Sequence, residues 1–339
     1  MKRKLVSFAT FFYHQQLENI FMKVLITGVG GFAGSHLADY IAGSTNSEIF
    51  GVLRDSEKSD NLSQIEEKVT LSTGEITDFQ SIFTIIKQVK PDVIFHVAGQ
   101  AFVPSSFEHA ADTFKTNVIG TINIFEAVKA AEISPRIIVV TSGEIYGETF
   151  GLPDLHTEQS IPQRVNPYAA SKTSMDYIAQ TYKKYEGLNI VIARPFNHTG
   201  PRQRPNFVCS SIAKQIVTIQ KTKAPKILKV GNIKARRDFT DVRDIAKGYW
   251  MLSQIDNKHN YIFNLCSGRI FAIEDIIHLF EEIVGEKFEL NVEPKRLRGY
   301  DIQLLAGSAN AMNHSVGWKA EIPFKKTLTE LIEYWNQQG

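Results

Sequence analysis

The chain has 339 residues, 43% of them hydrophobic and 22% charged, and its formal net charge is +2 at neutral pH. This composition is that of an ordinary globular protein with room for one large domain and a smaller one. The near-neutral charge, with basic residues spread along the chain, argues against a nucleic-acid partner. Cys209 and Cys266 lie far apart without metal-ligand or redox-pair spacing, so we expect two reduced thiols, a cytoplasmic protein and no metal site.

The first 21 residues form a separate segment. Three basic residues at positions 2–4 precede an apolar stretch, as at the start of a signal peptide, but the stretch breaks at residues 14–16 and no small-residue cleavage site follows. We therefore interpret residues 1–21 as an N-terminal extension and Met22 as the functional start. No other stretch approaches the roughly 18 uninterrupted apolar residues of a membrane span, so no membrane partner is expected.

Apolar runs of strand length alternate with helical patterns up to about residue 195. The expected strands are residues 24–27, 49–53, 69–72, 93–97, 137–141 and 190–194. The expected helices include residues 32–42, 78–89, 116–131 and 167–185, the last opened by Asn166 as N-cap and Pro167 at the first helical position. This alternation predicts an α/β fold of the Rossmann-like, doubly wound type, with a parallel sheet covered by helices on both faces.

After residue 195 the pattern becomes shorter and mixed. Loops rich in proline and arginine interrupt it at residues 201–205, 234–238 and 293–299, as expected where a substrate cap is assembled on a rigid core. We therefore expect an NAD(P)-binding domain over residues 22–195. A smaller C-terminal domain over residues 196–339 would bind mainly substrate, with some of its segments returning to the sheet.

The first expected strand runs directly into a glycine-rich turn, after which a helix begins. Gly28 permits the tight turn, Gly31 lets the backbone approach a pyrophosphate, and Gly34 allows close packing of the helix. The amides and dipole of the helix N-terminus favour the phosphate charge. Because the strand before and the helix after supply the required context, this spacing predicts a dinucleotide site.

The end of the second expected strand bears on cofactor choice. Arg54 and Asp55 follow it directly. An acidic residue here would bind a free ribose 2′-hydroxyl, whereas an arginine would pair with a 2′-phosphate. Because Arg54 comes first, NADP(H) is the preferred cofactor, with NAD(H) as the alternative.

The candidate residues for proton transfer lie on an expected helix and at the end of an expected strand. Tyr168 and Lys172 are four residues apart, so both side chains point from one helix face. A nearby ammonium stabilises tyrosinate, and we expect Lys172 to lower the pKa of the phenol so that it exchanges a proton with a sugar hydroxyl or carbonyl near neutral pH. Ser142, at the carboxyl end of the strand at 137–141, can donate to the same oxygen.

Two further side chains have alternative interpretations. Glu144 is either a catalytic base or a loop carboxylate, and the sequence leaves both open. His96 is expected to be a buried structural histidine. The backbone of Ala98 and Gly99 beside it is the better candidate for a cofactor contact.

Taken in order, the glycine motif, Ser142, the Tyr168 and Lys172 pair, and the run at residues 194–197 resemble the extended short-chain dehydrogenase/reductase family. The resemblance extends over nearly all of residues 22–339. Within that family, the runs at residues 194–201, 207–208 with 213–216, 230–232 and 237–244 look like the reductases of GDP-6-deoxy-4-keto-D-mannose.

The resemblance implies a role for each matching residue. Ser142, Tyr168 and Lys172 would be catalytic, with Glu144 beside them. The implied cofactor contacts are Gly28, Gly31, Phe32, Ala33, Gly34, Arg54, Glu75, Ile76, Val97, Ala98, Gly99, Tyr168, Lys172 and Pro195. The implied substrate contacts are Ser105, Ser142, Asn197, His198, Phe207, Val208, Lys214, Arg237, Arg298 and Asp301.

Some of these positions depart from the family pattern. Glu75 and Ile76 replace an aspartate and a leucine beside the adenine, and Asp301 replaces a ribose-binding glutamate with a shorter carboxylate. Arg237 and Arg298 match positions that hold the nucleotide diphosphate, a task that suits the planar guanidinium fork. Arg202 and Arg204 are expected to be surface arginines outside the core site.

The implied activity is the NAD(P)H-dependent reduction of the C4 ketone of a GDP-4-keto-6-deoxy sugar, in a homodimer formed through the helices at residues 116–131 and 167–185. A related GDP-6-deoxy-heptose would fit the same catalytic residues. A GDP-mannose 4,6-dehydratase is the first alternative, because it also carries a glutamate at position 144; another nucleotide-sugar dehydratase or epimerase is a further one. A cofactor-binding regulator without turnover is the alternative from another class.

Overall fold

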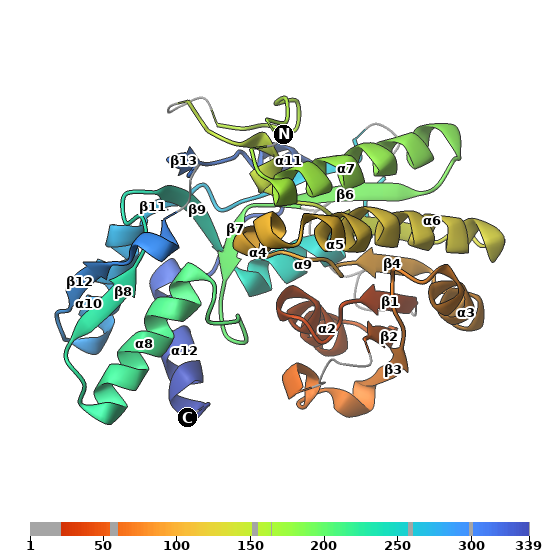
Figure 1. Ribbon diagram of the computed structural model, residues 1–339. Coiled ribbons are helices and arrows are strands. Elements are labelled where there is room, and N and C mark those ends of the chain that lie inside the picture. The colour runs from red at the N-terminus through yellow and green to blue at the C-terminus, as the bar shows by residue number, and fades with distance from the viewer. Residues whose placement is uncertain are drawn as a thin grey trace, which may run out of the picture.

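The computed structural model describes residues 22–54, 60–150, 155–163, 165–256, 260–297 and 301–338. The expected extension at residues 1–21 lies outside the described residues. The centre of the molecule is a seven-stranded parallel sheet in the order β10-β6-β5-β4-β1-β2-β3, which runs from β6 at the top to β3 at the bottom of Figure 1. Its strands are β1 (Lys23–Thr27), β2 (Glu48–Leu53), β3 (Val69–Thr73), β4 (Val93–His96), β5 (Arg136–Val140), β6 (Ile190–Pro195) and β10 (Ile262–Leu265).

Helices cover both faces of this sheet, which is why its strands read as continuous apolar runs. One face packs against α3 (Phe79–Val89), α6 (Gly120–Ala130) and α7 (Pro167–Tyr185), and the other against α2 (Phe32–Ser44) and α9 (Val242–Leu252). The short helices α4 (Val103–Glu108) and α5 (Ala110–Phe114) lead into α6. The doubly wound α/β fold expected from the sequence is therefore confirmed, with the expected elements matched to within a few residues.

The N-terminus of α7 shows how local sequence sets an element boundary. The Asn166 side chain accepts a hydrogen bond from the Ala169 amide at 2.7 Å, and Pro167 occupies the first helical position. An N-cap asparagine typically contributes about 1 kcal/mol. The expected start of this helix, which carries Tyr168 and Lys172, is confirmed.

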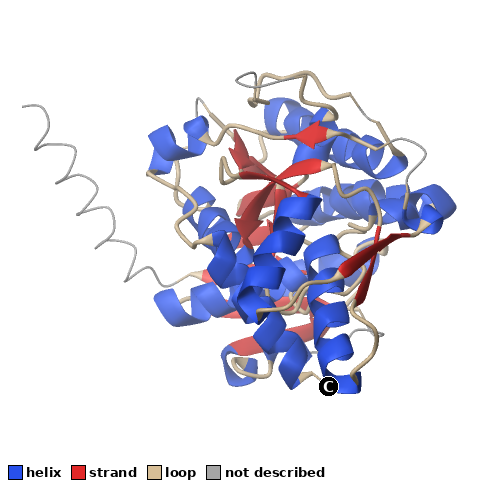
Figure 2. Cartoon of the chain, turned by 90° about the vertical axis from the view of Figure 1, so that its left-hand side faces the viewer, coloured by secondary structure: helices blue, strands red, loops and turns tan. Residues whose placement is uncertain are grey.

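The chain after residue 195 builds a second core and also returns to the first. Figure 2, viewed from the side of this second unit, shows its helices in front of the central strands. Its strands are β7 (Asn197–Thr199), β8 (Ile227–Val230), β9 (Arg236–Asp241), β11 (Ile270–Ala272), β12 (Glu289–Val292) and β13 (Leu304–Leu305). Its helices are α8 (Val208–Thr222), α10 (Ile273–Val284) and α12 (Phe324–Gln337). The segments that return to the first core are α9, which packs beside α2, β10, which extends the central sheet, and α11 (Asn310–Val316), which packs beside β10.

Both cysteines are free and buried, as expected from their spacing. Burial raises the pKa of the Cys209 thiol to about 12, so this thiol stays protonated at neutral pH. Among the helices of the described residues, none is both long and apolar enough to cross a lipid bilayer.

Candidate active site

The glycine-rich turn brings three backbone segments into close contact. Gly28 has φ +70°, and a Cβ there would lie 2.8 Å from the Cα of Ala98. A Cβ on Gly34 would overlap the carbonyl oxygen of Gly28, so α2 begins directly against the turn. The turn therefore has the shape that a dinucleotide pyrophosphate needs, with the α2 N-terminus facing it.

The segment after β4 forms the neighbouring wall. A Cβ on Gly99 would lie 2.9 Å from Asn117 Oδ1 and 3.3 Å from Lys172 Nζ, so this glycine brings the wall close to the Lys172 ammonium. His96 is fully buried, with Nδ1 2.9 Å from Thr27 Oγ1 and Nε2 3.0 Å from Thr121 Oγ1. Burial lowers its pKa to about 3, which confirms a neutral structural histidine.

Ser142 and Tyr168 meet between the end of β5 and the start of α7. Ser142 caps a short 3₁₀ turn (Gly143–Tyr146), and its Oγ accepts a hydrogen bond from the Glu144 amide at 3.1 Å. The Ser142 hydroxyl also lies close enough to the phenol of Tyr168 to lower its pKa. The two side chains therefore converge on one place, as the sequence predicted, where a substrate oxygen would have two hydroxyl neighbours.

The electrostatics of the phenol differ from the expectation. Burial raises the pKa of Tyr168 to about 12, the Ser142 hydrogen bond lowers it, and the charge of Glu144 raises it. Lys172 Nζ donates instead to the Val140 carbonyl at 2.9 Å. The expected lowering of the Tyr168 pKa by Lys172 is therefore wrong for the protein alone, because the desolvation of the buried phenol outweighs the interactions that would lower its pKa.

Lys172 itself is strongly perturbed. It is 4% exposed, and burial lowers its pKa to about 8. Apart from the Val140 carbonyl, its described contact is the Met175 sulfur at 3.7 Å. A buried ammonium with three donors and one oxygen acceptor beside Gly99 is suited to receive hydroxyl groups such as those of a ribose.

Glu144 is held at the edge of this group. Its Oε1 accepts a hydrogen bond from Asn166 Nδ2 at 3.2 Å, and it is half-buried. Its negative charge raises the pKa of Tyr168. This position is compatible with a base and with a loop carboxylate, so both interpretations of Glu144 remain.

Asn117 is a residue of this site that the sequence did not reveal. It is fully buried in a π-helical turn (Lys115–Ile119), a local distortion common at functional sites. Its Oδ1 accepts from the Gln100 amide at 2.8 Å, and its Nδ2 donates to Ser171 Oγ at 2.9 Å. Asn117 therefore links the segment after β4 to α7, the helix that carries Tyr168 and Lys172. The available signal was a polar side chain on the buried face of the helix expected at 116–131.

The part of the chain after residue 195 contacts this site through the Phe196 ring and a C-terminal segment. A Cβ on Gly143 would lie 2.7 Å from the Phe196 ring, and one on Gly307 would overlap it. Arg237 is 7% exposed and lies beside Asp301, with Nη2 3.3 Å from Oδ1. The structure thus brings the predicted residues Arg237 and Asp301 together; Arg298 lies outside the described residues.

The remaining predicted substrate contacts fall in different places. The ring of His198 stacks on Phe32 at 5.8 Å, and that of Phe207 meets Phe102 edge-on at 5.8 Å. The ammonium of Lys214 lies 4.7 Å from the centre of the Trp335 ring in α12 and is exposed. The other three are partly or fully exposed at element ends or in α4: Ser105, Asn197 and Val208.

The remaining predicted cofactor contacts lie at several places along the carboxyl edge of the sheet and at the start of α2. Arg54 is exposed directly after β2, and Asp55 lies outside the described residues. Glu75 is half-buried, and Ile76 packs against Gly120. The others lie at the carboxyl edge of the sheet or at the start of α2: Phe32, Ala33, Val97 and Pro195.

Known proteins share this architecture over nearly the whole chain. Residues 25–331 match the family described as GDP-mannose 4,6 dehydratase. GDP-6-deoxy-D-mannose reductase of Pseudomonas aeruginosa is 31% identical over 318 residues, covering 93% of this chain and 98% of that protein. Human GDP-mannose 4,6 dehydratase is 26% identical over 337 residues, covering 91% of this chain and 90% of that protein.

A solved structure agrees with these sequence comparisons. The structure of RMD from Pseudomonas aeruginosa complexed with NADPH aligns with a TM-score of 0.81 at 29% identity, covering 95% of this chain and all of that one. The expected membership of the extended short-chain dehydrogenase/reductase family is confirmed. With the glycine turn, Ser142, Tyr168 and Lys172 in place, the chain belongs to the GDP-mannose 4,6-dehydratase family of NAD(P)-dependent nucleotide-sugar enzymes.

Proposed function

We propose that this enzyme reduces the C4 ketone of a GDP-4-keto-6-deoxy sugar with NADPH. The observation that carries the proposal is the convergence of the Ser142 and Tyr168 hydroxyls beside a buried Lys172, in a chain similar throughout to a GDP-6-deoxy-D-mannose reductase. A ketone needs a hydride and a proton to become an alcohol. This site has hydroxyl donors where the carbonyl oxygen would lie.

The residues of the chain divide the chemistry among them. A bound nicotinamide would supply the hydride. Ser142 donates a hydrogen bond to the carbonyl oxygen, and Tyr168 gives it a proton as negative charge develops there. Lys172 holds the cofactor ribose, so the charge of the ammonium remains near the phenol when Tyr168 loses its proton.

The choice of cofactor follows from the end of β2. Arg54 is the first residue after the strand and is exposed. A guanidinium can pair with a 2′-phosphate in a way that no carboxylate can. We therefore propose a preference for NADPH over NADH; the relative from Pseudomonas aeruginosa was solved with NADPH.

The nucleotide would bind at the C-terminal segment. Arg237 is nearly buried and is held by its ion pair with Asp301, whose Oδ2 also accepts from Asn232 Nδ2 at 2.8 Å. A fixed guanidinium loses less conformational entropy on binding a diphosphate than a free one. We propose that Arg237 and Arg298 hold the diphosphate and that Asp301 holds the ribose.

The decisive experiment offers two substrates in turn. With GDP-4-keto-6-deoxymannose, we expect NADPH oxidation and formation of GDP-6-deoxymannose, detected by absorbance and by mass spectrometry. With GDP-mannose alone, we expect no reaction. Lack of NADPH oxidation with any GDP-4-keto-6-deoxy sugar would refute the proposal.

A dehydratase is the second candidate, because the Glu144 carboxylate lies close enough to influence the phenol. Dehydration of GDP-mannose requires a base for the C5 proton, and Glu144 is placed to serve as one. Formation of the keto-sugar from GDP-mannose without net NADPH use, abolished in Glu144→Gln, would favour the dehydratase. A reductase should keep most of its rate in that variant.

We also propose a homodimer through α6 and α7. Apolar side chains are exposed on and beside these helices, with Ile119 45% and Tyr177 47% exposed. Burial of such side chains against a second copy would form a four-helix interface. Light scattering should give twice the chain mass, and Ile119→Glu should shift it toward the monomer.

A further inference from the structure

One stripe of α2 contacts the loop that follows β7. Phe32, His36 and Asp39 are spaced by four and then three residues, so they lie on one face of the helix. Each contacts the segment at residues 198–202 in turn. Phe32 stacks on His198 at 5.8 Å, His36 Nε2 donates to the Pro201 carbonyl at 3.0 Å, and Asp39 Oδ2 pairs with Arg202 Nη1 at 2.6 Å. We call Phe32, His36 and Asp39 the α2 stripe.

The loop itself is tightly folded. Gln203 is 6% exposed; its Nε2 donates to the His198 carbonyl at 2.9 Å, and its Oε1 accepts from Thr199 Oγ1 at 2.6 Å. Arg202 has φ +71°, a left-handed conformation that costs a residue with a side chain roughly 1 kcal/mol. The Arg202 side chain is only 15% exposed, so the expected surface arginine is in fact a structural one.

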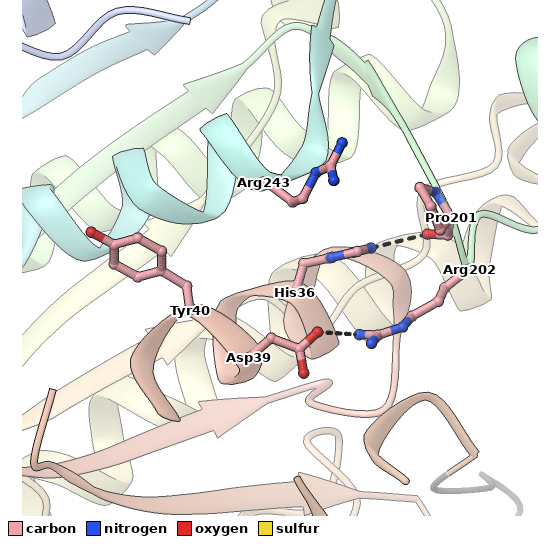
Figure 3. Close-up of a pocket in the computed structure, with 6 residues that line it drawn as sticks. All are labelled: His36, Asp39, Tyr40, Pro201, Arg202 and Arg243. Atoms are coloured by element: carbon pink, nitrogen blue, oxygen red, sulfur yellow. Dashed lines mark hydrogen bonds and ion pairs between the residues drawn. The ribbon is translucent and has the colours of Figure 1, made fainter. Parts of the chain in front are cut away.

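Figure 3 shows both polar contacts, side by side between α2 and the loop. The four residues that make them belong, with Tyr40 of α2 and Arg243 of α9, to the lining of a pocket of about 400 Å³. Burial lowers the pKa of His36 to about 4. The ring is therefore neutral at physiological pH, and its Nε2 carries the proton because a carbonyl can only accept. The polar contacts between α2 and this loop thus include one neutral hydrogen bond and one half-buried ion pair, beside the stack of Phe32 on His198.

The α2 stripe and the loop that it contacts connect the expected cofactor side of the site to its expected substrate side. α2 begins at the glycine turn, and β7 carries Asn197 and His198 beside β9. We propose that His36, Asp39 and Arg202 are positioning residues that couple dinucleotide binding at the glycine turn to the ordering of residues 197–203. The proposal rests on the cofactor part of the proposed function and is independent of which sugar nucleotide is used.

Hydrogen exchange measured by mass spectrometry tests this coupling directly. Peptides covering residues 197–206 are compared with and without saturating NADP⁺. We expect the cofactor to slow exchange in the wild type by at least about fivefold, the lower end of typical site-to-site coupling. In Asp39→Asn and in Arg202→Gly the same addition should slow exchange less than twofold.

The choice of variants separates positioning from folding. Glycine tolerates positive φ, so Arg202→Gly should be at least as stable as Arg202→Ala while lacking the same ion pair. The matched control is Glu282→Gln on α10, which removes an exposed ion pair with Lys325 of α12 and should leave the coupling at its wild-type value. Affinity for NADP⁺, measured by calorimetry, is expected to change little in any of them.

Two results would overturn the inference: a wild-type segment whose exchange NADP⁺ leaves unchanged, or variants that retain the wild-type slowing. Failure to bind either NADP⁺ or NAD⁺ would remove the cofactor part of the proposed function and the inference together. Failure to turn over a GDP-keto-sugar would affect only the proposed substrate, because the exchange measurement contains none.

Discussion

Replacing Lys172 by methionine should stabilise the protein without cofactor while removing most of its activity. The ammonium is buried, and its pKa falls from the ordinary 10.5 to about 8. At about 1.4 kcal/mol per tenfold change, that difference amounts to a cost of roughly 3 kcal/mol for keeping the charge in the folded protein at pH 7. Losing the hydrogen bond to the Val140 carbonyl offsets about 1 kcal/mol of it. Methionine has a similar length and no charge, so a net gain of about 2 kcal/mol is expected.

The sign of the pH dependence provides the sharper test. Because the folded pKa lies below the unfolded one, the unfolded chain binds more protons between about pH 8 and 10.5. The stability of the wild type therefore rises with pH through this window, and the cost of the buried charge is fully present only below about pH 8. Lys172→Met lacks this dependence, so its advantage should be largest at pH 7 and should shrink toward pH 10.5.

Urea unfolding without cofactor at pH 7 and pH 10 measures both quantities. Lys184→Met, an exposed substitution on the same helix, is the control and should change stability by less than about 0.5 kcal/mol at either pH. A Lys172→Met protein that is less stable than wild type at pH 7, or whose difference from wild type is independent of pH, would refute the reasoning. The same variant should bind NADPH more weakly, because the ribose would lose its ammonium.

Three further substitutions test other parts of the site. Tyr168→Phe keeps the ring but removes the proton donor, so kcat should fall on the order of 10² to 10⁴-fold with NADPH binding retained; near-normal kcat would refute the role of Tyr168. Arg54→Ala should reduce kcat/KM with NADPH and leave that with NADH nearly unchanged, and an unchanged cofactor preference would exclude Arg54 from reading the ribose. Asp176→Asn disrupts a buried bidentate pair with Arg194, whose Nε and Nη2 donate at 2.8 Å each. It should cost about 3 to 5 kcal/mol in urea unfolding, and a cost below 1 kcal/mol would contradict the view that this pair is structurally required.

Local chemistry alone predicted much of the site. The strand, glycine turn and helix around Gly28, the N-cap at Asn166, and the shared face of Tyr168 and Lys172 each depend on residues a few positions apart. Such features can be predicted from the sequence because turn geometry, capping and helical periodicity are properties of short segments. Ser142 followed in the same way, as the residue after a buried strand at the carboxyl edge of a parallel sheet.

The tertiary structure decided what depends on distant residues. Burial sets the pKa of Tyr168 to about 12 and that of Lys172 to about 8, and no spacing along the helix predicts the loss of solvent. Arg202 resembles a surface arginine until Asp39, 163 positions away, is found beside it. Asn117 acquires its place from partners on two other segments. These features escape the sequence because desolvation and ion pairing are set by which segments pack together, and that packing is fixed only when the whole chain has folded.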